Sequence, residues 1–256
     1  MRPLTHKEKT MLTLTGRTAA ITGATGYQGM GIVHALLDAG MNVAMMTHFA
    51  GRSEEIIASL PEEQRSRCAY FVSEGSDADC LEDIYGKFGS IDVIIPNHGG
   101  PIQPHSVKDI NPENFQRKLT HQIMGAFNLV QAAIPYLEKS SAGRIIFMTT
   151  AGAQNGDLGE GLEDNVARGG TIAMTYSLAR ELAPMGITVN CVAKSGFKDV
   201  KFKTDIVEDS PLLPQIPVGR CGVPEELGAA VQWLCSEEAG FVTGAVINVS
   251  GGLQLG

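Results

Sequence analysis

The first feature of the sequence that could do chemistry is a glycine-rich turn near the N-terminal end. Gly23, Gly26 and Gly29 follow a short apolar run and precede a segment with helical spacing. Glycine lets the backbone approach a pyrophosphate closely, and the free N–H groups of a helix start attract its charge. The turn indicates a dinucleotide site, although a tight strand–helix turn that binds nothing has the same pattern. Tyr27 could protrude into such a site or fold outward against the next helix.

The second apolar run ends without the acidic residue that would hold the ribose of NAD. Thr47 and His48 stand there, and Arg52 follows a few residues on. Arg52 could meet a 2′-phosphate and favour NADP, or it could be a solvated surface arginine.

Strands and helices alternate along the chain from Thr18 onward, and this alternation predicts an α/β fold with a parallel sheet covered on both faces. The expected strands are Thr18–Thr22, Asn42–Thr47, Ala69–Val72, Val93–Ile95, Arg144–Thr149, Thr188–Ala193 and Val246–Val249. The expected helices are Met30–Ala39, Glu54–Leu60, Leu81–Phe88, Asn114–Leu137, Ala167–Ala183 and Glu225–Cys235.

The domain organisation that we predict is simple. Residues 1–15 read as a polar N-terminal leader, and residues 16–256 as a single doubly wound domain. The longest irregular segment, Lys194–Pro217, follows a late strand, where such loops tend to cover the ligand crevice.

Composition excludes several classes of function. The chain has 256 residues, 43 % of them hydrophobic and 19 % charged, as in an ordinary globular protein. A net charge of −8 argues against nucleic acid or an anionic membrane as the main partner. Five cysteines without a CxxC pair argue against a disulfide scaffold or a structural zinc site. No apolar run is long enough for a membrane span, so we expect a cytoplasmic protein without a metal.

Three longer stretches resemble the short-chain dehydrogenase/reductase family, and the resemblance extends over nearly all of residues 16–252. These stretches are Ser177–Asn190 (SLARELAPMGITVN), Gly219–Gly252 and Gly89–Gly99. The resemblance implies a Rossmann-type seven-stranded parallel sheet. It also implies a dimer or tetramer built on the two long helices near Asn114–Leu137 and Ala167–Ala183.

The same resemblance implies hydride transfer between nicotinamide and a carbonyl or alcohol. The family uses a Tyr as general acid/base, a Lys four residues later that holds the ribose, a Ser that polarises the carbonyl, and an Asn that anchors a water. Counting along the matched stretches places these four positions on Asp164, Arg168, Thr150 and Gln122. The family's YxxxK motif is therefore absent, and every member of the tetrad is replaced.

The change to Asp164 matters most. A carboxylate with an ordinary pKa of about 3.9 is ionised at neutral pH and has no proton for a forming alkoxide. Asp164 and Arg168 are four residues apart with the acid nearer the helix start, which predicts an intrahelical ion pair. Thr150 still offers a hydroxyl to a carbonyl, although a strand-end threonine more often satisfies its own backbone.

The segment Pro96-Asn97-His98-Gly99 stands where the family usually has Asn-Asn-Ala-Gly. The resemblance makes Asn97 a cofactor contact alongside the glycine turn, if a cofactor binds. His98 is a titratable newcomer near the expected nicotinamide position. It could serve as a replacement acid/base, or it could be a hydrogen-bonded loop histidine.

The halohydrin dehalogenases share the family's fold, keep Arg in place of Lys, and carry a T-x4-F/Y-x-G turn. Thr22, Tyr27, Gly29 and Arg168 fit that pattern. Those enzymes need Ser and Tyr at the positions of Thr150 and Asp164, so the turn resembles them and the chemical centre does not.

The function that we predict is a non-catalytic subunit that assembles with an active paralogue bearing YxxxK, in an NAD(P)-dependent alcohol/ketone oxidoreductase. One alternative is an enzyme with altered chemistry, either a reductase using another acid/base or a lyase like the dehalogenases. Another is a regulator that binds a dinucleotide without reacting. NAD(P) is the cofactor if there is one.

Overall fold

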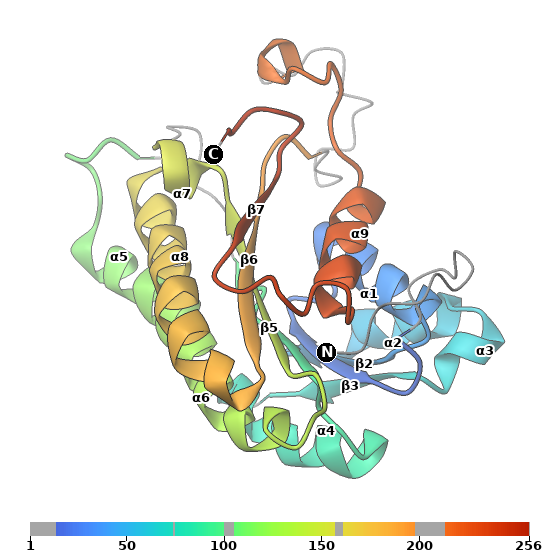
Figure 1. Cartoon of the computed structure of the whole chain (residues 1–256). Coiled ribbons are helices and arrows are strands. Elements are labelled where there is room, and N and C mark those ends of the chain that lie inside the picture. Colours follow the sequence, from blue (N-terminus) through green and yellow to red (C-terminus); the bar gives the residue numbers. More distant parts are fainter. Residues whose placement is uncertain (1–13, 74, 100–104, 157–160, 198–212, 256) are drawn as a thin grey trace.

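The centre of the molecule is a parallel sheet of seven strands in the order β3-β2-β1-β4-β5-β6-β7 (Figure 1). The computed structural model describes residues 14–73, 75–99, 105–156, 161–197 and 213–255. The strands are β1 (Thr18–Thr22), β2 (Asn42–Thr47), β3 (Cys68–Val72), β4 (Val93–Ile95), β5 (Arg144–Thr150), β6 (Thr188–Lys194) and β7 (Val246–Val249). This is the doubly wound Rossmann-type order, so the predicted fold class is confirmed.

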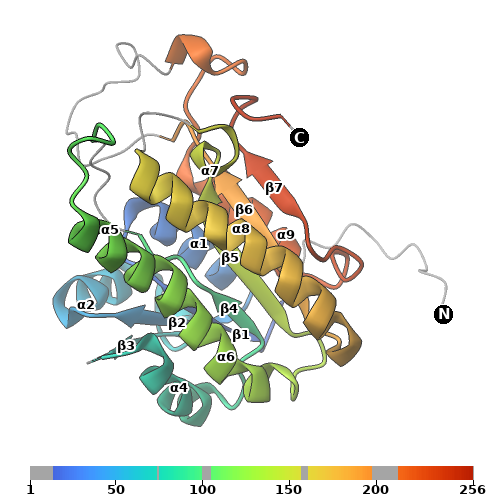
Figure 2. The same cartoon turned by 90° about the vertical axis from the view of Figure 1, so that its left-hand side faces the viewer.

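Helices cover both faces of the sheet. One core cluster joins the sheet to α1 (Tyr27–Asp38), α2 (Ala50–Ser59) and α9 (Pro224–Cys235). The other joins it to α4 (Leu81–Phe88), α6 (Gly125–Leu137) and α8 (Leu162–Leu182). Figure 2 shows α5, α6 and α8 in front of the strands, on the face opposite to α1 and α9. The remaining elements are α3 (Glu62–Arg65), η1 (Asp77–Cys80), α5 (Pro112–Leu119), η2 (Thr120–Met124), α7 (Gly152–Asn155), η3 (Ala183–Met185) and η4 (Leu213–Gln215).

The central strands explain why the chain forms two cores. Every residue of β1 is buried, and its side chains alternate between the two clusters. Ala19 and Ile21 pack on the side of α1 and α9, whereas Ala20 packs on the side of α4 and α6. A strand buried on both faces is expected to be largely apolar, and β1 has only its two terminal threonines as polar residues.

One of the predicted helices is interrupted in the structure. The sequence predicts an uninterrupted helix over Asn114–Leu137, but the structure divides it into α5, the π-helical turn η2 and α6. A π turn adds one residue to a helical turn and shifts the side chains that follow, and apolar spacing does not reveal so short an insertion. Gln122, one of the predicted site residues, lies within this turn.

Some predictions fall outside the described residues. Most of the expected N-terminal leader lies in residues 1–13, and most of the Lys194–Pro217 segment lies in residues 198–212. Within the described part of the chain, no helix has the length and apolar character needed to cross a membrane.

Candidate functional site

The glycine-rich turn connects β1 to α1 and is fastened to the loop after β4. The backbone N–H of Asn97 donates to Oγ1 of Thr22 at 2.9 Å, and the Asn97 side chain donates to the carbonyl of Gly23 at 3.3 Å. Gly23 has φ +60°, and a Cβ on it would lie 2.5 Å from the Asn97 carbonyl oxygen. A Cβ on Gly29 would lie 2.4 Å from the Gly23 carbonyl oxygen. Both glycines are required by backbone packing.

The phosphate end of an NAD(P) site fits these residues. Gly26 precedes α1 and makes no side-chain cap, so the first N–H groups of the helix are available to a pyrophosphate. A Cβ on Gly26 would meet only one atom, the Gly23 carbonyl oxygen at 3.4 Å, so this glycine is not required by packing. Tyr27 is half-buried as the first residue of α1. Gly23, Gly26, Gly29 and Asn97 would hold the pyrophosphate and its ribose, while NAD(P) would supply the hydride.

The position expected for the proton donor is closed. Asp164 lies near the start of α8, and its carboxylate is 1 % exposed. Lys118 of α5 donates to its Oδ2 at 2.5 Å, and Nε2 of Gln122 donates to its Oδ1 at 3.0 Å. The two donors lie four residues apart, which places them on one side of the segment formed by α5 and η2. Asp164 therefore crosslinks α8 to this segment.

The predicted ion pair between Asp164 and Arg168 is wrong. Among the described residues, the ion-pair partner of Asp164 is Lys118, and Arg168 lies within ion-pair distance of no carboxylate. The i, i+4 rule considers only one helix, whereas a buried carboxylate takes whichever cation the tertiary fold brings to it. Arg168 is 7 % exposed, and its Nε is buried without a hydrogen-bond partner.

The other two residues predicted from the sequence at tetrad positions are also buried. Thr150 is the last residue of β5, lies opposite Lys194 of β6 and is 4 % exposed. Gln122 is 5 % exposed, and its amide is committed to Asp164. Along α8 the face toward the sheet begins with polar residues and ends with apolar ones. Its buried residues are Glu163, Asp164, Ala167, Arg168, Thr171, Thr175, Ala179 and Leu182.

His98 is part of a buried cluster of hydrogen-bonded groups. Its side chain is 5 % exposed, and its Nε2 lies 2.8 Å from Oδ2 of Asp77. Burial would raise the pKa of Asp77, but the hydrogen bond from His98 and the nearby positive charge lower it below its usual range. The ring of His121 packs edge-on against His98 with the centroids 5.6 Å apart. Burial, followed by the neighbouring His98, lowers the pKa of His121.

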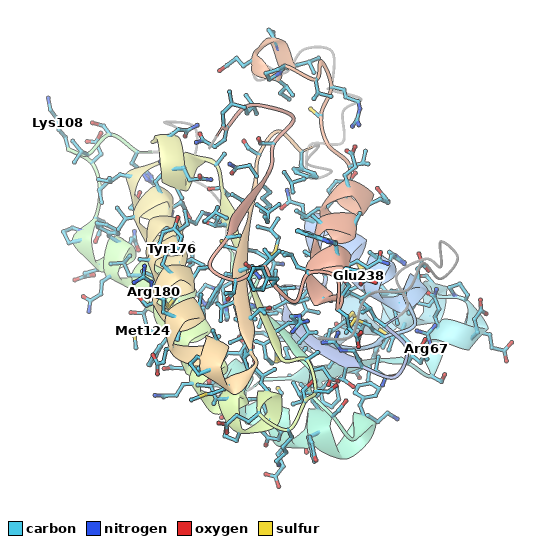
Figure 3. The ribbon with its side chains drawn as sticks, in the orientation of Figure 1. Arg67, Lys108, Met124, Tyr176, Arg180 and Glu238 are labelled. Carbon is cyan, nitrogen blue, oxygen red and sulfur yellow. The ribbon has the colours of Figure 1, made fainter. Side chains whose placement is uncertain are left out.

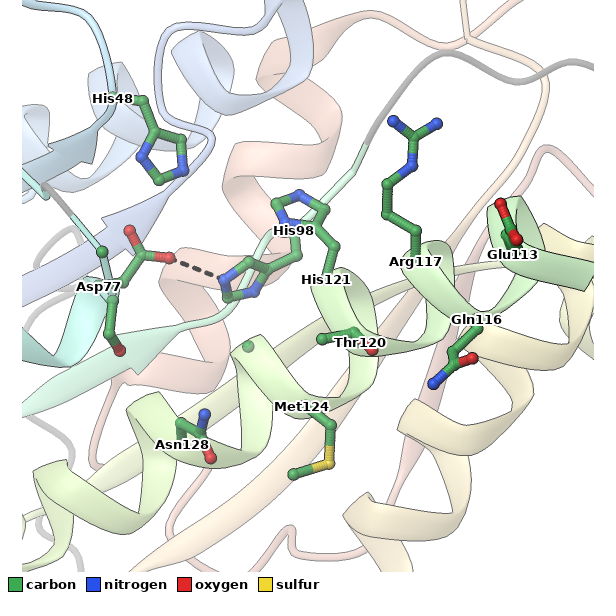
Figure 4. Close-up of a pocket in the computed structure, with 13 residues that line it drawn as sticks. His48, Asp77, His98, Glu113, Gln116, Arg117, Thr120, His121, Met124 and Asn128 are labelled. Atoms are coloured by element: carbon green, nitrogen blue, oxygen red, sulfur yellow. Dashed lines mark hydrogen bonds and ion pairs between the residues drawn. The ribbon is translucent and has the colours of Figure 1, made fainter.

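A cavity of about 580 Å³ opens beside this cluster (Figure 4). His48 reaches it from the end of β2, Asp77 from the segment after β3, and His98 from the loop after β4. Arg117 and His121 line it from α5 and η2. Its lining does not include the glycine-rich turn or Asn97. Arg52, the candidate for a 2′-phosphate, is exposed on α2.

Sequence reasoning missed Lys118 and Asp77. Lys118 is four residues before Gln122, and this spacing is the only signal that could have placed both on one side of a helix. Asp77 follows Ser76, which caps η1, so the local pattern explains the turn and not the contact with His98. Among the described residues, no group of three or more His, Cys, Asp or Glu side chains is arranged to hold a metal ion.

Taken together, the sheet order and the turn after β1 define a dinucleotide-binding type of fold, and comparisons with known proteins agree with this class. The sequence profile described as enoyl-(acyl carrier protein) reductase matches residues 23–254. An acetoacetyl-CoA reductase of Rhizobium meliloti (strain 1021) is 31 % identical over 241 residues, which cover 92 % of this chain and 98 % of the relative.

Solved structures agree in fold. A 3-ketoacyl-(acyl-carrier-protein) reductase from Brucella melitensis, complexed with NADH, has a TM-score of 0.86 and 25 % identity, covering 95 % of this chain and 100 % of that one. A protein described as a dehalogenation enzyme has a TM-score of 0.85 and 26 % identity, with 95 % and 100 % coverage. The chain belongs to the short-chain dehydrogenase/reductase family of oxidoreductases.

Proposed function

We propose that this chain is a non-catalytic subunit of a hetero-oligomeric, NAD(P)-dependent alcohol/ketone oxidoreductase. The observation that carries the proposal is the environment of Asp164, which is buried and bonded to Lys118 and Gln122. A general acid must have a proton to give and room for the substrate beside it, and both oxygens of this carboxylate already accept hydrogen bonds from neighbouring side chains. The group at the position of the family's proton donor thus has a structural role, as a link between α8 and the segment formed by α5 and η2.

The two long helices keep an apolar surface that supports assembly. Residues of η2, α6 and α8 with partly exposed apolar side chains include Met124, Phe127, Leu162, Val166 and Tyr176. Figure 3 shows Met124 and Tyr176 on the same side of the molecule, beside α8. Because α8 also contacts α5 and η2, these side chains belong to neighbouring elements. An exposed apolar patch of this kind marks a surface for a protein partner.

The partner that we propose is a paralogue with an intact YxxxK motif. The chain would then resemble the inactive subunit of the 2-(hydroxybenzyl)succinyl-CoA dehydrogenase of anaerobic toluene degradation, whose tetrad shows the same pattern of loss. In such an assembly the active subunit carries the proton transfer, and this chain supplies the shared helices.

A reductase that uses His98 as its acid/base is less well supported. The His98 side chain is 5 % exposed and bonded to Asp77, which describes a buried structural histidine better than a group that contacts substrate. A lyase of the dehalogenase kind would need a donor to the epoxide oxygen at the position of Asp164, and that carboxylate is buried and bonded to Lys118 and Gln122.

The test is co-expression with an intact relative from the same genome, followed by light scattering and native mass spectrometry. We expect a mixed oligomer, and we expect the chain alone to show no oxidation of NADH or NADPH with acetoacetyl-CoA as the probe. A purified chain that forms a homotetramer with steady NAD(P)-linked turnover would rule the proposal out.

A pair of matched substitutions locates the contact. Val166 on α8 is 42 % exposed, and Val72 at the end of β3 is 45 % exposed. We expect Val166→Asp to prevent the mixed oligomer and Val72→Asp to leave it intact, because only the first introduces a charge into the apolar surface of the long helices. Equal effects of the two substitutions would place the interface elsewhere.

A further inference from the structure

Two residues that line one small cavity each carry a buried side-chain nitrogen without a hydrogen-bond partner. The two atoms are Nε of Arg168 on α8 and Nδ1 of His98 in the loop after β4. The cavity has a volume of about 10 Å³, and the other residues that line it are Pro96, Gln122, Ala126, Met148 and Thr171. Buried polar nitrogens in native proteins are nearly always hydrogen-bonded, so two unpaired ones in a shared cavity indicate a missing ligand.

The size of the cavity limits what can enter. A volume of this order holds one water-sized particle and leaves no room for a polyatomic group such as phosphate or a carboxylic acid. The ligand must therefore be a water molecule or a monatomic ion.

The unpaired charge of Arg168 favours an ion over a water molecule. The guanidinium of Arg168 is permanently charged and 7 % exposed, and no described carboxylate forms an ion pair with it. Asp164, the acid one helical turn away, is already neutralised by Lys118. A buried charge is costly unless it has a counter-charge, and a water molecule would satisfy hydrogen bonds without supplying one.

The His98 ring is oriented so that it can donate a second hydrogen bond into the cavity. Its Nε2 faces the Asp77 carboxylate at 2.8 Å, which leaves Nδ1 toward the buried side. In the imidazolium form both ring nitrogens donate, so Nδ1–H can donate to an anion while Nε2–H donates to Asp77. The charged and titratable groups around the ring are Asp77 after β3, His48 after β2, His121 in η2 and Arg168 in α8.

We propose that this cavity is a binding site for a single halide ion, held between Arg168 of α8 and His98 of the loop after β4. The ion supplies a counter-charge to Arg168, which pairs with no carboxylate among the described residues, and connects α8 to the loop after β4. This inference does not depend on the proposed function, because it concerns the state of a buried cavity and not turnover.

The first experiment measures thermal unfolding in sodium bromide and in sodium gluconate at equal ionic strength, since gluconate is too large to enter. We expect Tm to be about 2–4 °C higher in bromide, because a ligand that binds only the folded state stabilises it.

Variants separate this site from general salt effects. We expect Arg168→Gln to abolish the difference between bromide and gluconate, and Arg168→Lys to retain part of it. Arg180 lies exposed on the same helix, so Arg180→Gln is the matched control and should keep the full difference. If Arg168→Gln does not fold, His98→Phe removes the second donor and should reduce the same difference.

The decisive observation is a crystal soaked in bromide. We expect an anomalous peak in the cavity, within hydrogen-bond distance of Nε of Arg168 and Nδ1 of His98. A cavity without an anomalous peak, or a bromide effect on Tm that persists at full size in Arg168→Gln, would overturn the proposal and leave water as the occupant.

Discussion

The glycine-rich turn after β1 and the polar face of α8 represent the two halves of a dehydrogenase site, and different physical requirements fix their residues. In the turn, a Cβ on Gly23 or Gly29 would collide with backbone atoms. These glycines are needed for folding whether or not a nucleotide binds. On α8, Asp164 and Arg168 stand where counting along the sequence predicts the family's Tyr and Lys, and those residue types would be required by the chemistry alone.

This difference determines how strongly the turn and the polar face of α8 each support an inference about function. Because packing alone demands Gly23 and Gly29, the presence of these two glycines is weak support for cofactor binding. The side chains of Asp164 and Arg168 meet no such backbone constraint, and Asp164 is held by a cation and an amide from another helix. Asp164 and Arg168, if they stand at the Tyr and Lys positions as the sequence predicts, are therefore the stronger indicator of function.

The largest change in stability that would test this comparison is expected from Gly29→Ala. The new Cβ would lie 2.4 Å from the Gly23 carbonyl oxygen and 2.7 Å from that of Ala24, and neither backbone atom can move away cheaply. We expect the free energy of unfolding, measured in urea without nucleotide, to fall by about 3 kcal/mol.

Two controls accompany this measurement. Gly51→Ala adds a Cβ in open space on α2 and should raise stability by about 0.5–1 kcal/mol. Gly26→Ala adds one at an ordinary contact distance and should cost less than about 1 kcal/mol. If Gly29→Ala and Gly26→Ala are equally stable, backbone packing does not explain the turn.

The second largest effect on stability is expected at the polar face of α8, from Lys118→Met. The substitution leaves the Asp164 carboxylate buried and without its cation, which destabilises a folded protein strongly. Since the Lys118 side chain is 21 % exposed, we expect a loss of about 2 kcal/mol, smaller than for a fully buried pair. Lys87→Met, at an exposed lysine of α4, should change stability by less than about 0.5 kcal/mol.

The double variant tests whether the pair acts as a unit. Lys118→Met combined with Asp164→Asn removes both charges and should be more stable than Lys118→Met alone. An additive result would mean that Asp164 does not depend on Lys118.

The sequence was sufficient for the fold because buried parallel strands have an unmistakable pattern. Four strands, among them β1 and β2, begin and end where the apolar runs do, and Pro112 and Pro224 open α5 and α9. These features depend on residues that are adjacent along the chain, so local propensity and periodicity reveal them.

The site was harder to predict because its contacts join distant segments. Lys118 and Asp164 are 46 residues apart, and Asp77 and His98 are 21 apart. The helix rule for pairs at i, i+4 favoured Arg168 because it takes no account of α5. The π turn in η2 changes which residues of this segment face α8, and no local residue type announces it.

The smallest effect concerns the histidine cluster, which lies between the two halves. Burial lowers the pKa of His121, so the folded protein binds fewer protons than the unfolded chain just below the ordinary histidine pKa of about 6.5. The contribution of the neutral ring is present above that pH and is lost as the pH falls through the lowered pKa. We therefore expect the free energy of unfolding to decline between about pH 7 and pH 5.

His121→Gln should flatten this decline in the free energy of unfolding, because glutamine has no proton to take up. His34→Gln, at an exposed position of α1, is the control and should leave the decline unchanged. Asp77 does not interfere in this window. Its pKa is lowered, so its contribution is lost only as the pH falls below the ordinary aspartate range near 4. A decline that survives in His121→Gln would assign it to another histidine of the cluster, and His98 and His48 are then the next two positions to change.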